Sequence, residues 1–490
     1  MPQPLVYEIN TRCWLRELAA RSGRPAMLAT VPEPEFARWQ RLGFTHIWPM
    51  GVWRNGPRAR AQALSEHQRR HYSEVLPGWT EADADGSPYA IGDYEVSNAL
   101  GGETGLQEFR QALRGEGLKL VLDFVPNHFG VDHPWVGERS DLFVQTAAAR
   151  PETFLQDTSR GPRWLAHGKD PYWPAWTDTV QLDYRLQATQ DAMTQALLRI
   201  AEQCDGVRCD MAMLLLTEVF ARTWQGFPVN PTSTASSGEF WATAIQKVKK
   251  AHPGFLFLAE AYWGLEPQLQ ALGFDYTYDK NLYDSLVRHD GVAAAQRVLT
   301  QPAPELARSA HFLENHDEPR IAGLLSPEEH RAAAFLMLVL PGLRLLHDGQ
   351  LTGAGVRVPV QLTRRPAESE RPQIREMYEQ LLAVDAETSV GRGTARVLRP
   401  KALSGERPPD AVVLIQWQND ARMLRLAAVN LGPQACRCSA PLVLETARAN
   451  LSFADRLAEH RFSRSSQEIR EQGLVLELAP YATHLFELTD

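Results

Sequence analysis

Residues 119–128 read Lys-Leu-Val-Leu-Asp-Phe-Val-Pro-Asn-His, an apolar run that closes on an aspartate, an asparagine and a histidine. A short apolar run that ends in turn-forming residues is typical of a buried strand in a parallel sheet. Polar side chains that follow such a strand lie at its carboxyl end, where α/β proteins place binding and catalytic groups. This stretch therefore predicts an α/β architecture and the edge of the sheet at which a site would form.

Seven other apolar runs resemble this one, and amphipathic stretches such as 240–251 and 327–340 separate several of them. Alternation of strands with helices favours a parallel sheet. Eight such units over about 350 residues predict a closed (β/α)8 barrel, the TIM barrel, with insertions. The eight predicted strands are 5–9, 45–49, 119–125, 206–211, 256–261, 274–278, 310–314 and 344–346.

One connection is far longer than the others. About 60 residues, rich in Trp, Pro, Asp and Gly, separate the third predicted strand from the next helix, and a loop of that length is usually functional or a small domain. We therefore expect residues 127–184 to form a small subdomain inserted after strand 3. The catalytic barrel would then occupy residues 1–126 and 185–385.

The pattern changes again in residues 386–490. Apolar runs at 412–417 and 423–429 flank Asn419-Asp420, which is a hairpin turn signal. Further strand-like runs follow, and about 100 residues is a common size for a domain. We expect this region to be a C-terminal antiparallel β-sandwich.

Composition excludes several classes of protein. The chain has 490 residues, 44% of them hydrophobic, and 51 Lys plus Arg against 59 Asp plus Glu give a net charge of −8. A mildly acidic chain is a poor candidate for binding nucleic acid. No window reaches the ~18 uninterrupted apolar residues of a membrane helix, and the start of the chain lacks the pattern of a secretory signal. Five cysteines, an odd and small number, favour reduced thiols, so we expect a cytoplasmic protein without nucleic-acid or membrane partners.

Charged and polar residues follow four of the predicted strands. Taken singly, each has an ordinary structural explanation, since an Asp after a strand is often a helix cap and an Arg–Asp pair can be an ion pair. In a barrel, however, the carboxyl ends of all strands meet at one mouth. Four such coincidences, at the third, fourth, fifth and seventh predicted strands, favour a catalytic site, and the residues are Asp123 and His128, Arg208 and Asp210, Glu260, and His316 and Asp317.

These residues suit the chemistry of a retaining glycosidase, which needs two carboxyl groups about 5–5.5 Å apart. We expect Asp210 to be the nucleophile, because the neighbouring Arg208 would hold its carboxylate ionised. Glu260 follows an apolar strand, and apolar surroundings would raise its pKa as a general acid requires. Asp317, beside His316, would hold sugar hydroxyls and stabilise the positively charged transition state.

At these residues the sequence resembles the α-amylase family, glycoside hydrolase family 13, whose members are retaining α-glucan-active enzymes. The resemblance covers nearly the whole chain: barrel, subdomain after strand 3 and C-terminal sandwich. The segments that resemble the family's signatures are 123–128, 206–210, 258–260, 312–317 and, more faintly, 181–184.

The resemblance implies a role for each matching residue. It makes Asp210 the nucleophile, Glu260 the general acid/base and Asp317 the transition-state stabiliser. Arg208, His128 and His316 match residues that bind the glucosyl unit whose bond is cleaved. Tyr89 resembles the tyrosine that stacks under that sugar, although a packed core tyrosine fits its pattern equally well. Asp123 would support the site from behind.

Aromatic residues gather in the expected subdomain, at Trp164, Tyr172, Trp173 and Trp176. Their faces would suit the apolar face of a sugar ring in the acceptor cleft, but they would equally well pack a small subdomain that has few aliphatic residues. The sequence alone favours neither of these two interpretations.

Some residues depart from the family's pattern. Secreted endo-amylases usually follow the nucleophile with a Lys-His pair, whereas Met211-Ala212-Met213-Leu214 follow it here, and Ala259 replaces a frequent Gly. Asn127 matches a position that binds structural calcium in many members, but the sequence offers no clear set of the six to eight oxygen ligands that calcium takes. We therefore expect no required cofactor and no metal among the site residues, and we do not favour structural Ca²⁺.

The resemblance implies a carbohydrate substrate, and three functions stay open. The first is a retaining α-glycosidase that acts on α-glucans or maltooligosaccharides through a covalent glycosyl-Asp intermediate. The alternative is an α-glucan transglycosylase, such as a 4-α-glucanotransferase, a glucoside isomerase or a phosphorolytic relative, that uses the same site. The third, a binding protein that has lost catalysis, is disfavoured because all three carboxylates are present.

Overall fold

The structure of the protein is a computed structural model that describes residues 3–229, 234–236, 238–388, 390–419, 424–445 and 448–489. Eight parallel strands close into a barrel and follow chain order around it, as the sequence predicts. The first strand closes the ring, because Tyr7 pairs with Ile47 on one side and with Leu346 on the other. The barrel strands are β1 (Leu5–Asn10), β2 (His46–Met50), β5 (Lys119–Phe124), β11 (Gly206–Cys209), β12 (Leu256–Ala259), β13 (Tyr276–Tyr278), β14 (Ser309–Phe312) and β15 (Leu343–His347).

Several barrel strands end or begin one or two residues from their expected bounds, and β11 and β13 illustrate the local differences. Strand β11 ends at Cys209 rather than at residue 211, because Met211 takes a left-handed backbone conformation with φ 43°. Strand β13 begins at Tyr276, two residues later than expected, and Phe274 before it is fully buried in the core outside the barrel. Both strands keep their predicted place in the barrel.

The interior of the barrel is packed in layers, as alternation along each strand requires. Apolar side chains such as Val6, Val121 and Leu343 fill the lower part. Two positions further along their strands, Glu8 on β1 and Asp123 on β5 are also buried. The upper layer of the barrel is therefore polar, and it lies directly beneath the mouth.

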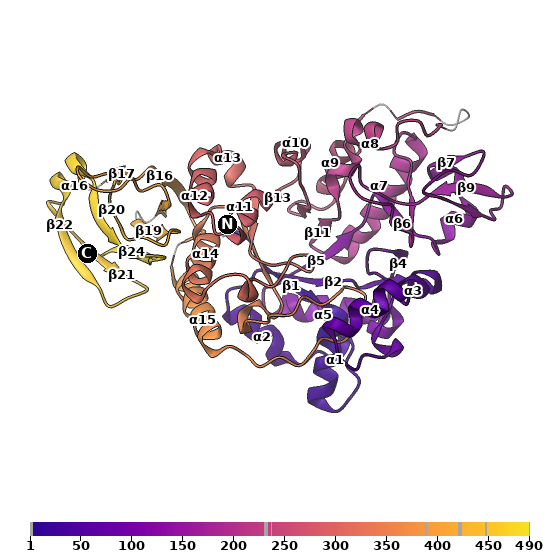
Figure 1. The fold of residues 1–490 in the computed structure, drawn as a ribbon, viewed down its shortest axis with the longest axis horizontal. Helices are drawn as coiled ribbons and strands as arrows, with labels where there is room; N and C mark the ends of the chain where they lie inside the picture. The colour runs from indigo at the N-terminus through magenta and orange to yellow at the C-terminus, as the bar shows by residue number, and fades with distance from the viewer. Residues whose placement is uncertain are drawn as a thin grey trace.

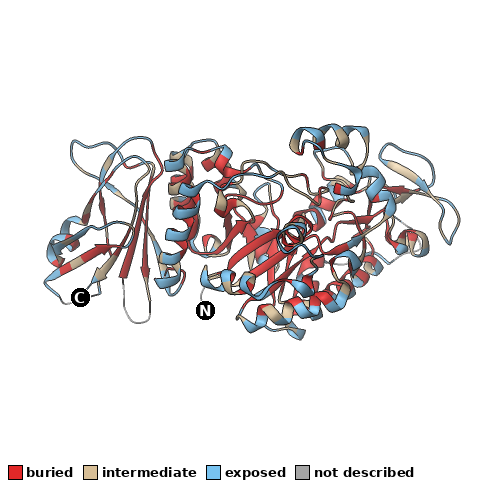
Figure 2. Cartoon of the chain, turned by 90° about the horizontal axis from the view of Figure 1, so that it is seen from below, coloured by how far each residue is buried: buried red, intermediate tan, exposed pale blue. Residues whose placement is uncertain are grey.

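Helices cover the outside of the barrel, and Figure 2 shows their buried faces turned inward and their exposed faces outward. The predicted helix 240–251 matches α9, and 327–340 matches α14, which Ser326 caps by accepting from the Glu329 amide. No helix in the described part of the chain is long and apolar enough to cross a membrane. The main helices of this layer are α1 (Thr11–Ser22), α2 (Glu33–Arg41), α5 (Gly102–Gly115), α7 (Gln187–Gln203), α8 (Thr217–Thr223), α9 (Phe240–Ala251), α10 (Glu266–Ala271), α11 (Lys280–Val287), α12 (Gly291–Thr300), α14 (Pro327–Val339) and α15 (Pro372–Glu387).

Two insertions extend the barrel on the side of its mouth. The sequence predicts the second, after β5, which contains β6 (His128–Gly130), α6 (Pro134–Glu138), β7 (Gln145–Thr146), β8 (Thr153–Gln156), β9 (Arg163–Ala166) and β10 (Thr179–Gln181) in two small antiparallel sheets. It does not predict the first, after β2, whose elements are β3 (Trp53–Asn55), α3 (Pro57–Ala63), α4 (Glu66–Val75) and β4 (Ile91–Val96). The structure does not test the proposed domain boundaries beyond this arrangement.

The C-terminal region forms two antiparallel sheets at the far end of the barrel from the inserted sheets (Figure 1). The indole of Trp417 donates to the carbonyl of Val339 at 2.9 Å and ties this region to α14. Of the predicted hairpin, Asp420 and Met423 lie outside the described residues. The strands are β16 (Thr394–Leu398), β18 (Val412–Gln418), β19 (Leu424–Asn430), β24 (Thr483–Thr489), β21 (Asn450–Asp455) and β22 (Arg461–Ser465) in one sheet, and β17 (Lys401–Ala402), β20 (Cys436–Ala440) and β23 (Leu474–Leu478) in the other.

Candidate active site

The predicted site residues come together at the mouth of the barrel, although they lie far apart in the chain. Asp210 and Glu260 directly follow β11 and β12, and Asp317 lies in the loop after β14. All three carboxylates line one cavity of about 410 Å³. The cavity is also lined by His128 and Tyr89, which the sequence places in the two insertions. Convergence at the carboxyl ends of barrel strands therefore holds here as it does in barrels generally.

Arg208 joins two of the carboxylates. Its side chain is fully buried, and its Nη1 donates to Asp210 Oδ1 at 2.7 Å while its Nη2 lies 2.9 Å from Glu260 Oε2. The guanidinium also lies over the rings of Trp48 and Tyr89, 5.5 and 5.3 Å from their centres. One planar cation thus orients two acids at once, which suits its rigid fork of donors.

Glu260 is held by two further donors. The backbone N–H of Met211 donates to Oε2 at 2.6 Å, and the hydroxyl of Tyr262 donates to Oε1 at 2.8 Å. The left-handed turn at Met211, directly after Asp210, is strained for a side chain of that size, and it presents this amide to Glu260. Burial raises the pKa of Glu260 to about 7 against the opposing effect of Arg208, as the sequence predicts.

Asp210 differs from the expectation in one respect. Burial raises its pKa above the ordinary value, and the ion pair with Arg208 only partly offsets this effect. Arg208 lowers the pKa of this carboxyl group, as the sequence predicts, but the sequence does not reveal that the same guanidinium is shared with Glu260 or that both acids are buried.

Asp317 belongs to a second chain of contacts. His316 Nε2 lies 3.0 Å from Asp317 Oδ2, and His316 Nδ1 lies 2.5 Å from Glu8 Oε1. Burial alone would lower the pKa of His316, but the carboxylates of Asp317 and Glu8 raise it well above its usual value. The part of the Asp317 side chain that is covered by protein would raise its pKa, but 51% of the side chain is exposed, and the charged imidazole of His316 lowers that pKa to about 2.

The other predicted residues take supporting positions. Asp123 is buried and accepts from the indole of Trp48 at 3.1 Å and from the amide of Gly51 at 2.9 Å, so it lies behind the cavity as expected. Tyr89 lines the cavity and stacks on His316 with ring centres 5.1 Å apart. His128 Nε2 contacts the carbonyl of Tyr89 at 3.2 Å, and burial lowers its pKa to about 4.

Sequence reasoning missed two residues of this site, Glu8 and Tyr262. Glu8 lies inside β1, where a charged residue in an apolar run was the available sign of a function. Tyr262 stands two residues after Glu260 and looks like any partly buried aromatic residue in the sequence. Neither can be assigned a partner without the three-dimensional arrangement.

Comparison with known proteins assigns the chain to a family. The model of the α-amylase catalytic domain matches residues 40–380, more than two thirds of the chain. The chain belongs to the α-amylase family. The resemblance to this family is thereby confirmed, and Asp210, Glu260 and Asp317 all lie within the matched region.

Curated members of the α-amylase family match parts of the chain. The α-amylase MalA of Haloarcula japonica is 26% identical over 273 residues, which are 54% of this chain and 36% of that protein. The α-1,4-glucan:maltose-1-phosphate maltosyltransferase of Pseudomonas aeruginosa is 26% identical over 208 residues, which are 40% of this chain and 26% of that protein. The chain therefore matches less than half the length of each of these relatives.

Solved structures of the family share the whole architecture. The α-amylase of Geobacillus thermoleovorans, complexed with acarbose, superposes with a TM-score of 0.67 at 17% identity. The match covers 99% of this chain and 98% of that chain. At this identity the likeness shows the fold, with its barrel, small inserted sheets and C-terminal antiparallel sheets.

The aromatic residues of the inserted sheets divide between the two interpretations. Trp176 lines the cavity, and its ring centre lies 5.1 Å from that of His128. Tyr172 and Trp173 are 60% and 72% exposed, and Tyr172 meets the exposed Trp263 edge to face at 4.9 Å. Trp164 is half-buried on β9. One aromatic residue thus lines the cavity, and two others stand outside it in solvent.

Asn127, which matches the family's calcium position, and Asp183, in the fainter of the segments that resemble the family's signatures, both have hydrogen-bond partners within the protein. Asn127 Oδ1 accepts from Gln181 Nε2 at 3.0 Å, so it is already engaged. Asp183 forms two 2.7 Å hydrogen bonds to the guanidinium of Arg185. The described residues also contain no cluster of three His, Cys, Asp or Glu side chains that could hold a metal. Calcium takes six to eight oxygen ligands, and the amide oxygen that matches the family's calcium position already accepts a hydrogen bond.

Proposed function

We propose that this protein is a retaining α-glycosidase that acts on α-glucans or maltooligosaccharides by double displacement. The observation that carries the proposal is the single buried guanidinium of Arg208, which contacts both Asp210 and Glu260. A retaining glycosidase needs two carboxyl groups with different tasks on either side of one bond. A pKa of about 7 suits Glu260 to give a proton and later to take one back.

In the first step, an Asp210 carboxylate oxygen attacks the anomeric carbon while Glu260 gives its proton to the glycosidic oxygen. The leaving sugar departs with that proton, and a covalent glycosyl–Asp210 ester forms. In the second step, Glu260 takes a proton from water, and the water oxygen displaces Asp210 from the anomeric carbon. Two inversions at the same carbon return the α configuration.

The other polar residues of the cavity would act on charge and position. Asp317, whose carboxylate is kept ionised by His316, would stabilise the positive charge that develops on the sugar ring. Stacked Tyr89 and His316 would form the floor of the sugar site, with His128 beside them. Because Asp123 accepts from Trp48 and Gly51, it would keep that floor in place.

The proposal is tested with maltoheptaose in dilute buffer, following chain lengths and reducing ends with time. Shorter chains with rising reducing ends, and α-anomers as the first products in NMR spectra, are expected. A β-anomer as the first product would exclude the covalent route. Protein with Asp210→Asn, purified in parallel, controls for contaminating glycosidases.

The alternative is transglycosylation from the same covalent intermediate, by a 4-α-glucanotransferase, a glucoside isomerase or a phosphorolytic enzyme. One observation favours it: Tyr172 and Trp263 form an exposed aromatic pair, and Trp263 follows Glu260 by only three positions. Exposed aromatic faces would bind an acceptor sugar in place of water. A spread of maltoheptaose to longer and shorter chains at constant reducing ends would support transfer over hydrolysis.

A further inference from the structure

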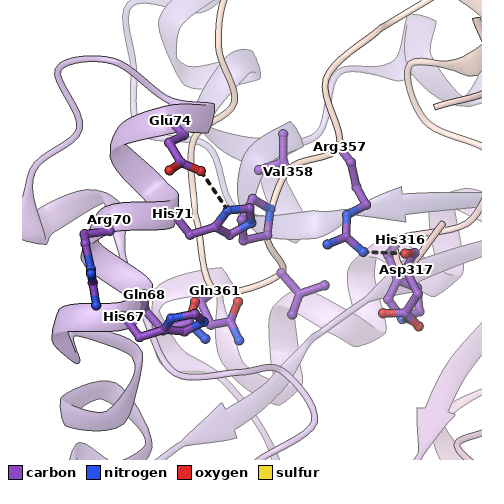
Figure 3. Close-up of a pocket in the computed structure, with 12 residues that line it drawn as sticks. His67, Gln68, Arg70, His71, Glu74, His316, Asp317, Arg357, Val358 and Gln361 are labelled. Atoms are coloured by element: carbon purple, nitrogen blue, oxygen red, sulfur yellow. Dashed lines mark hydrogen bonds and ion pairs between the residues drawn. The ribbon is translucent and has the colours of Figure 1, made fainter. Parts of the chain in front are cut away.

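A second cavity adjoins the first beyond Asp317. It has a volume of about 600 Å³, and it shares Gln68, Asp317, Val360 and Gln361 with the cavity that holds the carboxylates. Figure 3 shows its two walls: α4 carries His71 on one side, and the loop with Arg357 and Val358 lies opposite. Helix α4 belongs to the insertion after β2 that the sequence did not predict.

The position of Glu260 decides which part of a substrate would enter this cavity. Glu260, Met211 and Trp176 line the first cavity and not the second. Because the acid must reach the glycosidic oxygen, the leaving sugar lies on the side of Glu260 and Trp176. The second cavity lies across Asp317 from that side, so it extends the donor part of the chain, away from the bond that breaks.

The lining of the second cavity suits a neutral, hydroxyl-rich ring. Arg357 Nη1 donates to the backbone carbonyl of Asp317 at 2.5 Å, and among the described residues its other N–H groups have no hydrogen-bond partner. His71 pairs at 3.7 Å with Glu74, so the wall from α4 carries both a donor and an acceptor. Val358 and Pro359 add a small apolar surface. Closely spaced donors and acceptors around an apolar patch are the features that orient a small polar ligand.

We propose that this second cavity binds the second and further glucosyl units of the donor, so that the enzyme cleaves maltosyl or longer donors in preference to single glucosyl units. The inference rests on the proposed function, because it assigns a substrate length to the same site. A site made for one glucosyl unit would be closed behind Asp317. Here the space behind Asp317 is larger than the cavity that holds the carboxylates.

The experiment compares α-maltosyl fluoride with α-glucosyl fluoride. Both release fluoride on formation of the glycosyl–Asp210 ester, and neither carries a leaving sugar, so acceptor contacts drop out of the comparison. A kcat/KM for the maltosyl donor at least about tenfold higher is expected, since the added sugar contacts the enzyme in the transition state. Equal values, or a preference for glucosyl fluoride, would overturn this inference and leave the proposed function standing. Absence of fluoride release from both donors would overturn the proposed function and this inference with it.

A variant that fills the cavity separates this site from a general effect on the barrel. His71→Trp should lower the maltosyl-to-glucosyl ratio of kcat/KM at least about fivefold, because the larger ring occupies the space of the second sugar. Glu66→Trp, an exposed position on the same helix outside both cavities, is the matched control and should keep the ratio of the unmodified protein. An unchanged ratio in His71→Trp, with glucosyl fluoride still turned over, would refute the assignment of the cavity.

Discussion

Glu260 and Asp317 line the same cavity, yet their surroundings shift the pKa values of the two carboxyl groups in opposite directions. Burial raises the pKa of Glu260 to about 7, whereas His316 outweighs burial and brings that of Asp317 to about 2. Each has one cationic partner, and the distances are alike, 2.9 Å from Arg208 to Glu260 and 3.0 Å from His316 to Asp317. A close cation alone therefore does not decide the state of a carboxyl group in this site.

Two features account for the difference between these pKa values: the exposure of each side chain, and whether its cationic partner is shared with another acid. The side chain of Glu260 is 4% exposed and that of Asp317 is 51% exposed, so Asp317 keeps much of its hydration. Arg208 also serves Asp210, and the repulsion between these two acids raises the pKa of Glu260 further. One half of the site is thus a dry pair of acids on one cation, suited to proton transfer, and the other is a hydrated carboxylate, suited to steady negative charge.

Removing the nucleophile should cause the largest loss of activity among the substitutions considered. Asp210→Asn should lower kcat on maltoheptaose by about 10⁴-fold or more, because the ester cannot form without the carboxylate. Maltoheptaose affinity, measured by calorimetry, should change little. The control is Asp191→Asn on the outer face of α7. Retention of about a tenth of the rate would contradict the assignment of Asp210.

Replacing the acid would test the raised pKa directly. Glu260→Gln should lower kcat/KM on maltoheptaose by about 10²- to 10⁴-fold, because the leaving oxygen receives no proton. On α-glucosyl fluoride, whose leaving group needs no proton, the loss in kcat/KM should be far smaller. In the unmodified protein, kcat/KM on maltoheptaose should fall as the pH rises above about 7, where Glu260 loses its proton. Equal losses on both substrates would exclude Glu260 as the acid.

Removing the negative charge of Glu8 should weaken the cation beside Asp317, so that the pKa of Asp317 would move toward that of Glu260. Glu8→Gln removes a negative charge beside His316, so the pKa of His316 should fall and the charged imidazole should be lost at a lower pH. Asp317 would then lose its cation, and kcat/KM above neutral pH should drop about tenfold. The measurement uses α-glucosyl fluoride. Its leaving group needs no proton, so the loss of the Glu260 proton does not affect this pH profile. A uniform loss at all pH values would indicate a structural role for Glu8 instead.

The sequence predicted the fold and the main acids because both depend on local patterns. An apolar run followed by Asp210, Glu260 or His316-Asp317 places those residues at one mouth whatever the rest of the chain does, once the barrel is assumed. The partners that tune them depend on long-range contacts. Glu8 and His316, for example, are 308 positions apart in the sequence.

Insertions were less predictable than the barrel. The insertion between β2 and α5 has short elements, and α3 and α4 lack the long apolar periodicity that identifies a helix. The sequence therefore did not reveal that α4 reaches the cleft beside Asp317. Our proposal of a substrate-length preference therefore depends on the position of α4 in the structure and not on a sequence pattern.

The smallest expected effect concerns the hydrogen bond from Tyr262 to Glu260. Tyr262→Phe removes a donor to the ionised carboxylate at 2.8 Å, so the pKa of Glu260 should rise further. The fall in kcat/KM on maltoheptaose at high pH should move to higher pH, while the rate at its optimum drops about three- to tenfold, as the loss of one hydrogen bond predicts. Tyr276→Phe, a half-buried tyrosine that lines neither cavity, is the matched control. If the profile of Tyr262→Phe moved to lower pH, the hydroxyl would have to stabilise the protonated acid instead. The raised pKa of Glu260 would then be caused by Tyr262 as well as by burial.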